Sequence, residues 1–426
     1  SQWVARALEQ RGFVEKPLEE ADVVFINTCS VREKPEQKVY SALGRVHQAN
    51  PRAVVGVAGC VAQQIGAELM RRHPQVRFVG GADGIAPAPD AFVRLLHEPK
   101  LRLSYLDFTD SFPDRDPYLL DAAGQPAQEG VTPVAYVNIM QGCDNFCAYC
   151  IVPFTRGPRK SRSTQSVLDE CRHWVARGAG DITLLGQNVN VFGKDKYGDG
   201  TSFPELLRQV AAIPGLRRIR FVSAHPRDFS QETIDMFAEL PQLMPRLHLP
   251  LQSGSDSMLK KMGRGYDMER FLGVVEGLRK ARPDFALSTD LIVGFPGETE
   301  EEFEELCTWL KKYKLERVGA FAFSPEEGTL AAAMENQICL RVKEERNHDL
   351  LEVVNRIATA RNHALVGTQQ TILVEGPSKN NPERLQGRTS QNKPVIIPGN
   401  SAEIGSIVPV RITECTGFTL YGEVEK

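Results

Sequence analysis

The sequence predicts an α/β protein with three parts. They are an N-terminal doubly wound parallel-sheet domain, a central partial (β/α)6 barrel and a small C-terminal all-β barrel of the OB type. Three observations carry this prediction. Short β-branched runs alternate with helical patterns over residues 1–113, strand–helix units repeat six times over 134–362, and helical periodicity stops over 363–426. Alternation of strands and helices is typical of parallel sheets, and 426 residues are too many for one core.

The first domain, residues 1–113, opens inside an amphipathic helical pattern without a Met, so we expect a preceding segment that is missing here. Its apolar strand-like runs lie at 21–30, 53–64 and 76–84. Ligands of such sheets gather at the carboxyl ends of the strands. Cys29 and Cys60 each come just after an apolar run. We therefore expect both thiols at this edge of the sheet, where they could face the same point.

Residues 114–133 are rich in Pro, Gly and Asp and are expected to form a linker. In the central domain, 134–362, we expect strands at 134–140, 181–187, 218–224, 246–252, 285–295 and 317–323, with helices such as 164–178 and 300–314 between them. Six units are fewer than the eight that close a TIM barrel, so the barrel should stay open. Small and polar residues follow the strands, where a barrel enzyme carries its chemistry.

A helical pattern over 342–365 leads to the last domain, 363–426, where five short strands with turn signals predict a small β-barrel. Such barrels often bind nucleic acid. The net charge of −3 means that any nucleic-acid contact must come from local basic patches. No apolar run approaches the roughly 18–20 residues of a membrane span. Nine cysteines, an odd number in a long chain, favour reduced thiols that bind metal in a reducing cytoplasm.

Cys143, Cys147 and Cys150 form a C-x3-C-x2-C triplet after the first barrel strand. A closed structural zinc site would need a fourth ligand, such as a distant His225 or His248. Three closely spaced thiolates suit three corners of an iron–sulfur cube, which leaves the fourth iron open. An open iron can chelate S-adenosylmethionine (SAM), and an electron from the cluster can then release a 5′-deoxyadenosyl radical. Zinc binding and chance clustering of buried cysteines stay open as alternatives.

These features resemble the radical SAM methylthiotransferase family. The matching segments lie at 26–46, 56–64, 140–163, 184–193, 248–266 and 287–303. The resemblance covers nearly the whole length and includes a C-terminal part that is similar to a TRAM domain. The sequence SVREKPEQK after Cys29 resembles the tRNA-modifying branch. It differs from the branch that modifies a ribosomal protein and from the branch that acts on threonylcarbamoyl adenosine.

The resemblance implies two 4Fe–4S clusters. Cys143, Cys147 and Cys150 would hold the catalytic cluster, and Cys29 and Cys60 would be two of the three ligands of an auxiliary cluster. The third ligand would lie in a segment that this sequence does not contain. The implied reaction inserts sulfur and a methyl group at carbon 2 of isopentenyl-adenosine next to the anticodon of tRNA. SAM would be both methyl donor and radical source.

The implied partners are a tRNA anticodon stem–loop and a low-potential electron donor, and we expect a cytoplasmic monomer without a membrane contact. Two alternatives are methylthiolation of a ribosomal-protein side chain and a non-catalytic RNA-binding protein that contains a cluster or zinc. Strand-end positions predict the SAM contacts, namely Gly186, Gln187, Ser223, Gln252 and Asp290. Gly294 and Gly297 in GFPGE are expected to shape a turn.

Basic residues near the strand ends are candidates for contacts with RNA phosphates. The main candidates follow the triplet: Arg156, Arg159, Lys160 and Arg162. Two further runs are Arg217, Arg218, Arg220 and Arg227, of which the first three could lie at the wrong end of their strand, and Lys260, Lys261 and Arg264. Cys171 and Cys307 lie in amphipathic helical patterns and are expected to pack in the core.

Overall fold

The structure is a computed structural model that describes residues 2–30, 35–112 and 132–425. The predicted linker at 114–133 lies almost wholly outside these ranges, as do residues 31–34 of the segment that follows Cys29. The chain divides into two compact units. One comprises residues 1–126, 141–146 and 150–160, and the other comprises residues 127–140, 147–149 and 161–426.

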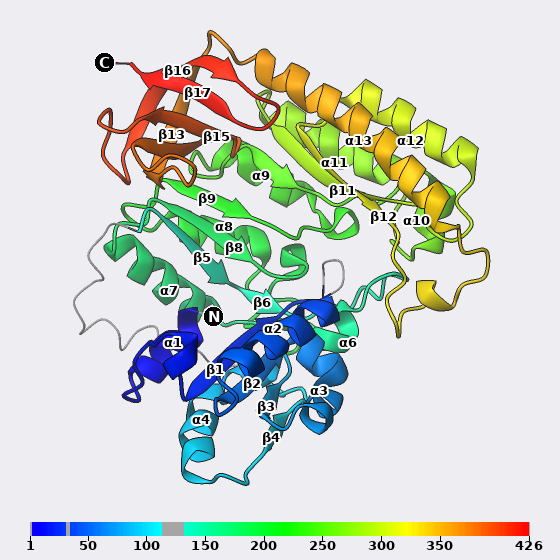
Figure 1. Cartoon of the computed structure of the whole chain (residues 1–426). Helices are drawn as coiled ribbons and strands as arrows, with labels where there is room; N and C mark the ends of the chain where they lie inside the picture. Colours follow the sequence, from blue (N-terminus) through cyan, green and yellow to red (C-terminus); the bar gives the residue numbers. More distant parts are fainter. Residues whose placement is uncertain (1, 31–34, 113–131, 426) are drawn as a thin grey trace. The chain divides into compact units, whose positions relative to one another are not determined.

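The first unit contains a parallel four-stranded sheet whose strands keep chain order (Figure 1). The strands are β1 (Val23–Thr28), β2 (Val54–Gly59), β3 (Val76–Gly80) and β4 (Leu103–Tyr105). The helices are α1 (Gln2–Glu9), α2 (Pro35–Ala49), α3 (Cys60–Arg72) and α4 (Ala88–His97). The first three strands and the opening helix confirm the prediction, whereas β4 is too short for a strand signal in the sequence.

Helices cover both faces of this sheet. Val57 of β2 packs with Leu43 of α2 and Leu69 of α3 in one apolar cluster. Phe78 of β3 packs with Phe92 of α4 in another, with α1 at its side. Burial on both faces explains why every residue of β2 is apolar or glycine, a pattern typical of central parallel strands.

The second unit contains the six predicted barrel strands (Figure 1). They are β5 (Val134–Asn138), β8 (Asp181–Leu185), β9 (Arg218–Phe221), β10 (Arg246–His248), β11 (Ala286–Val293) and β12 (Arg317–Ala322). All pair in parallel, in the orders β5-β8-β9 and β10-β11-β12. A single parallel bridge, Ile219 to Leu243, joins β9 to the segment before β10. The expected partial α/β barrel is confirmed.

The barrel helices begin at side chains that cap them. The helices are α7 (Thr164–Ala176), α8 (Phe203–Ala211), α9 (Gln231–Glu239), α10 (Asp256–Lys261), α11 (Met268–Ala281) and α12 (Glu300–Tyr313). The caps, in the same order, are Ser163, Ser202, Ser230, Ser255, Asp267 and Thr299. Each cap accepts a hydrogen bond from a backbone N–H of the first turn, which typically contributes about 1 kcal/mol. Local chemistry thus fixes where each helix starts and, with it, the length of each strand–helix connection.

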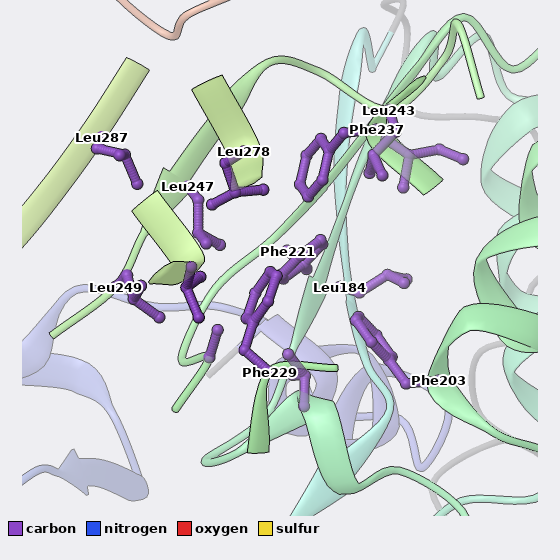
Figure 2. Close-up of a cluster of buried hydrophobic side chains, with 14 of the residues drawn as sticks. Leu184, Phe203, Phe221, Phe229, Phe237, Leu243, Leu247, Leu249, Leu278 and Leu287 are labelled. Atoms are coloured by element: carbon purple, nitrogen blue, oxygen red, sulfur yellow. The ribbon is translucent and has the colours of Figure 1, made fainter. Parts of the chain in front are cut away.

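Aromatic side chains fill the space between strands and helices of this barrel (Figure 2). The rings of Phe203 and Phe221 meet edge to face with their centroids 5.0 Å apart. Phe221 also faces Phe237, at 5.9 Å. Such pairs add directional packing to the area that they bury, so this core gives the strand ends a rigid base.

The long helix α13 (Leu340–His363) precedes a closed five-stranded barrel. Its strands are β13 (Gln369–Pro377), β14 (Arg384–Thr389), β15 (Pro394–Pro398), β16 (Ile407–Cys415) and β17 (Leu420–Val424). Alternate residues such as Ile372, Val395, Ile397 and Val410 form its core. The expected small all-β barrel is confirmed. Among the described helices, none has the length and apolar character that crossing a membrane requires.

Candidate active site

The cysteine triplet lies in a loop that follows the first barrel strand. A short strand, β6 (Met140–Gln141), leads into it, and α6 (Val152–Arg156) follows it. Gly142 has a φ of 80°, and a Cβ there would lie 2.1 Å from the carbonyl oxygen of Pro158, so this turn requires glycine. Cys147 is buried, whereas Cys143 and Cys150 are half-buried.

The residue types of this loop fit an iron–sulfur cluster. Cysteine thiolates are the usual ligands of such clusters. One of the thiols, Cys147, accepts a hydrogen bond from a guanidinium group. Within the described ranges, no three His, Cys, Asp or Glu side chains form a group that could hold a metal ion in this conformation. The assignment of the three cysteines as cluster ligands therefore remains a prediction, which rests on their residue type and spacing.

Arg264 is the guanidinium that faces Cys147. Its Nη1 donates to Cys147 Sγ at 3.3 Å, and its side chain is almost completely buried. The prediction that Arg264 contacts RNA phosphate is therefore wrong, because the side chain points into the protein. Lys260 and Lys261 of the same run are exposed and remain available.

Phe146 and Tyr149, which lie between the cysteines, differ in their surroundings. Phe146 is 57% exposed, has a φ of 38° and meets the ring of Phe154 edge to face. The ring of Phe146 therefore lies at the surface and does not shield the cysteines from solvent. Tyr149 accepts a hydrogen bond from Arg264 Nη1 at 3.3 Å.

The predicted SAM contacts lie on successive barrel strands or directly after them. Gly186 and Gln187 follow β8, and a Cβ on Gly186 would collide with Met140 at 2.6 Å. Ser223 follows β9 with a φ of 63°. Left-handed backbone at a residue with a Cβ is uncommon and tends to occur at functional sites.

Gln252 and Asp290 are brought together by the structure. Gln252, with a φ of 79°, donates its backbone N–H to the carbonyl of Asp290 at 2.9 Å and accepts from the N–H of Ile292. Asp290 lies within β11, and its Oδ2 is 3.2 Å from His248 Nε2. A Cβ on Gly319 of β12 would lie 2.4 Å from Asp290 Oδ1, so glycine leaves space for this carboxylate. No local pattern in the sequence indicated His248 or Gly319 as neighbours of Asp290.

Cys29 and Cys60 lie at the carboxyl ends of neighbouring parallel strands, as expected. Thr28, the last residue of β1, pairs in register with Gly59, the last residue of β2. Cys29 is exposed, and Cys60, the first residue of α3, is buried. The hydroxyl of Thr28 accepts from the backbone N–H of Val61, which ties this strand end to the start of α3.

Arg156, at the end of α6, donates its Nε to Cys60 Sγ at 3.4 Å. Burial alone would raise the pKa of Cys60, but the charge and hydrogen bond of Arg156, with bonds from Ser30 and Thr155, lower it. A thiol with a lowered pKa is suited to be a metal ligand. The half-buried Arg156 thus contacts a cysteine, and its predicted contact with phosphate stays a prediction.

Lys160 and Arg162 do not face solvent, so their predicted phosphate contacts are also wrong. Lys160 is fully buried and pairs with Asp83. Arg162 is buried and pairs with Glu170 of α7. Arg159 is the other remaining candidate of this run, with a side chain that is 30% exposed and 3.1 Å from Asp144.

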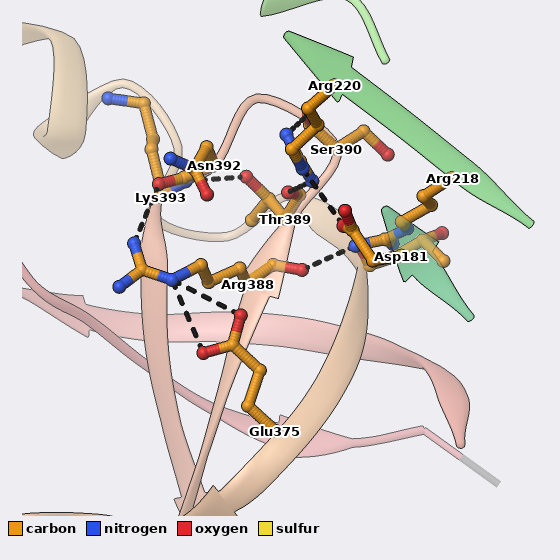
Figure 3. A network of polar contacts seen from close by, with 10 residues as sticks. Asp181, Arg218, Arg220, Glu375, Arg388, Thr389, Ser390, Asn392 and Lys393 are labelled. Carbon is orange, nitrogen blue, oxygen red and sulfur yellow. Dashed lines mark hydrogen bonds and ion pairs between the residues drawn. The ribbon is translucent and has the colours of Figure 1, made fainter. Parts of the chain in front are cut away.

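Arg218 and Arg220 of β9 contact the C-terminal barrel (Figure 3). Arg218 donates to the carbonyl of Arg388 at 2.8 Å. Arg220 pairs with Asp181 at 2.9 Å and donates to the carbonyls of Thr389 and Ser390. Arg217 similarly donates to the carbonyl of Gly405. A phosphate role for the buried Arg218 and Arg220 is wrong. The exposed Arg217 stays a candidate, as does Arg227, whose exposed side chain lies beside Asp228.

The cysteines without a proposed role behave as core or surface residues. Burial raises the pKa of Cys171 to about 12, and burial also raises the pKa of Cys307. Such thiols are poor nucleophiles and poor metal ligands. His225, an alternative zinc ligand, is buried, and desolvation lowers its pKa to about 3. Gly294 and Gly297 have φ values of 72° and 75°, as expected for the GFPGE turn.

Three family models match the chain: the Radical SAM superfamily at residues 137–310, the uncharacterized protein family UPF0004 at 1–81 and the TRAM domain at 363–424. A curated protein from Nitratidesulfovibrio vulgaris, named tRNA-2-methylthio-N(6)-dimethylallyladenosine synthase, is 50% identical over 99% of this chain and 94% of its own length. This chain belongs to the same family.

Other members of the tRNA-2-methylthio-N(6)-dimethylallyladenosine synthase family show the same extent of similarity. A synthase from Lawsonia intracellularis is 45% identical over 99% of this chain and 94% of its length, and one from Moorella thermoacetica is 40% identical over 100% and 95%. The solved structure of the radical S-adenosylmethionine methyltransferase TsrM from Kitasatospora setae aligns with a TM-score of 0.57 at 15% identity. It covers 78% of this chain and 70% of TsrM. At this identity the likeness concerns the fold alone.

Proposed function

We propose that this chain is a tRNA methylthiotransferase. It would insert sulfur and a methyl group at carbon 2 of isopentenyl-adenosine next to the anticodon, with SAM as both methyl donor and source of the 5′-deoxyadenosyl radical. The observation that carries this proposal is the 50% identity over 94% of a curated synthase that is named for this product. The cysteine triplet within the matched Radical SAM region supports the radical part of the chemistry.

For the cofactors, we propose one 4Fe–4S cluster at Cys143, Cys147 and Cys150 and a second at Cys29 and Cys60 with a further ligand. The cluster at the triplet would supply the electron that cleaves SAM. The protein itself would keep water away from part of the site and would place positively charged guanidinium groups beside the cysteine sulfurs. Buried Cys147 beside Arg264 and Cys60 beside Arg156 support this role.

The SAM pocket is proposed at the carboxyl ends of the barrel strands. Asp290 would accept hydrogen bonds from SAM hydroxyl or amino groups, because it has free acceptor capacity beyond its contact with His248. The close packing of Gly186 against Met140 brings the backbone near the cysteine loop. This position suits a contact between the backbone and the methionine part of SAM. Gln187, Ser223 and Gln252 complete the proposed contacts.

For the substrate, the adenine must leave its stack in the anticodon loop to reach the site. Phosphates of the stem–loop would meet exposed cations, namely Arg159, Arg227, Lys260 and Lys261. The TRAM domain, matched at 363–424, would add a second RNA-binding surface. We further propose the domain limits 1–113, 134–362 and 363–426, a monomer, and an external low-potential electron donor.

An anaerobic SAM-cleavage assay tests the radical part of the proposal. Reconstituted protein with SAM and a reductant should form 5′-deoxyadenosine, and Cys143→Ala should abolish it because the cluster loses a ligand. Cys339→Ala is the matched control, since Cys339 is an exposed thiol outside the proposed sites and should leave product formation unchanged. If the wild-type protein with its iron bound forms no 5′-deoxyadenosine, the non-catalytic alternative replaces this proposal.

A further inference from the structure

Arg264 occupies an unusual position for a charged side chain. It is 5% exposed, and its guanidinium donates to four acceptors. Nη1 lies 3.3 Å from both Cys147 Sγ and Tyr149 Oη, Nη2 lies 2.8 Å from the carbonyl oxygen of Pro250, and Nε lies 3.2 Å from Tyr266 Oη. These bonds fix the plane of the guanidinium against the cysteine loop.

Within the residues that the structure describes, Arg264 forms no ion pair with a carboxylate. Five arginines are buried in the described ranges, and three of them pair with a carboxylate. The pairs are Arg162 with Glu170, Arg220 with Asp181 and Arg346 with Glu298. Arg218, the fourth, donates to backbone carbonyls close to Asp181. The ionisable groups within hydrogen-bond reach of Arg264 are Tyr149, Tyr266 and Cys147, and the nearby His225 is not a carboxylate.

A buried cation without a countercharge is costly. Among the four acceptors of Arg264, the sulfur of Cys147 is the one that belongs to the proposed cluster ligands. A cysteine that binds iron does so as a thiolate, which would place a negative charge directly against the guanidinium.

The backbone holds Arg264 to the same loop. The N–H of Ala148, next to Cys147, donates to the carbonyl of Met262 at 2.8 Å. Gly263 and Gly265, on either side of Arg264, have φ values of 69° and 68°, which lets the chain turn sharply on both sides of the arginine. Main-chain and side-chain contacts thus couple this segment to Cys147.

We propose that Arg264 is the counter-cation of the cluster held by the cysteine triplet, and that it raises the cluster's reduction potential. This inference depends on the proposed function, because it requires a cluster at Cys143, Cys147 and Cys150. Hydrogen bonds to ligand sulfurs and net charge are established determinants of cluster potential. Reduction adds one negative charge to the cluster. A fixed cation beside a ligand sulfur stabilises the reduced form more than the oxidised form, so Arg264 is a positioning residue that eases electron uptake.

The test is a redox titration followed by electron paramagnetic resonance, without tRNA. All variants carry Cys29→Ala and Cys60→Ala, so that the signal comes from the triplet cluster. Arg264→Gln keeps a hydrogen-bond donor and removes the charge. Arg264→Lys keeps the charge but lacks the planar set of N–H donors of the guanidinium group. Lys280→Gln, at an exposed lysine of the same unit outside the proposed sites, is the matched control.

We expect Arg264→Gln to lower the ratio of reduced to oxidised cluster at least tenfold at a fixed ambient potential, which corresponds to about 59 mV for a one-electron couple. Arg264→Lys should show a smaller shift, and Lys280→Gln none. If Arg264→Gln retains no iron, the comparison is made with Arg264→Lys against the control.

An unchanged midpoint potential in Arg264 variants that hold about four irons per chain overturns the inference and leaves the proposed function intact. Absence of iron from the parent protein with Arg264 in place refutes the proposed cluster itself. The iron content therefore distinguishes the two failures before any potential is measured.

Discussion

Replacement of Lys160 by Met should destabilise the N-terminal unit strongly. The side chains of Lys160 and Asp83 are 0% and 1% exposed and form an ion pair. Removing one partner of a buried pair typically costs about 3–5 kcal/mol, because a buried charge is left behind. Asp83 would keep the hydrogen bonds from Thr109 N at 2.8 Å, Thr109 Oγ1 at 3.0 Å and the Gln141 amide. We therefore expect the lower end of the range, about 3 kcal/mol.

Hydrogen exchange of peptides from β2 and β3 measures this loss within the unit itself. A loss of about 3 kcal/mol makes exchange through unfolding roughly 100-fold faster. Lys160→Met combined with Asp83→Asn should recover part of the loss, because no charge is then buried alone. Lys100→Met is the control, since Lys100 is exposed in the same unit and should change stability by less than about 0.5 kcal/mol.

Unchanged exchange in Lys160→Met would refute the buried ion pair and would return Lys160 to the list of candidate phosphate contacts. A change in tRNA affinity with unchanged exchange would have the same meaning. The double variant separates loss of charge balance from loss of packing, because packing alone predicts no recovery.

Three further perturbations test other parts of the structure. His225→Gln should remove part of the pH dependence of stability. Desolvation lowers the pKa of His225 from 6.5 to about 3, and the positive charges of Arg264 and Arg227 outweigh the opposite effect of Asp228. Between pH 7 and 5, His225 takes up a proton in the unfolded chain but not in the folded protein. The free energy of unfolding of the wild-type protein, measured in urea, should therefore fall by about 2 kcal/mol more than that of the variant. Gly319→Ala should raise the dissociation constant for SAM about tenfold by displacing Asp290, measured by calorimetry. Arg220→Gln should loosen the C-terminal barrel and speed its release by limited proteolysis, at a cost of about 3 kcal/mol.

Each of these expectations has a contradicting result. Parallel pH profiles for the wild-type protein and His225→Gln would mean that His225 is protonated in the folded state. Equal SAM affinity in Gly319→Ala would remove Asp290 from the proposed pocket. An equal rate of barrel release in Arg220→Gln would show that the contacts in Figure 3 do not hold the barrel in place.

The architecture could be predicted because its signals are local. The barrel strands are short apolar runs, most of them with β-branched residues. Each barrel helix starts at a Ser, Thr or Asp that caps it, and a C-terminal strand such as β14 alternates buried and more exposed residues. The placement of Cys29 and Cys60 at one sheet edge followed from parallel pairing of two such runs. These features need no knowledge of distant contacts.

The fates of the basic residues could not be predicted, because they depend on distant partners. Lys160 pairs with Asp83, 77 positions away, and Arg264 reaches Cys147, 117 positions away. Arg156 and Arg159, three positions apart, contact a cysteine and an aspartate respectively. A run of like charges gives no information about which member is buried and which is exposed.

The most direct test of the central claim is mass spectrometry of tRNA nucleosides. The reconstituted protein, with SAM and a reductant under anaerobic conditions, is incubated with tRNA that carries isopentenyl-adenosine beside the anticodon. The proposed function predicts conversion of this nucleoside to its 2-methylthio derivative, and loss of the product in Cys143→Ala. An unchanged nucleoside, from protein that holds its iron and forms 5′-deoxyadenosine, would contradict the assigned substrate.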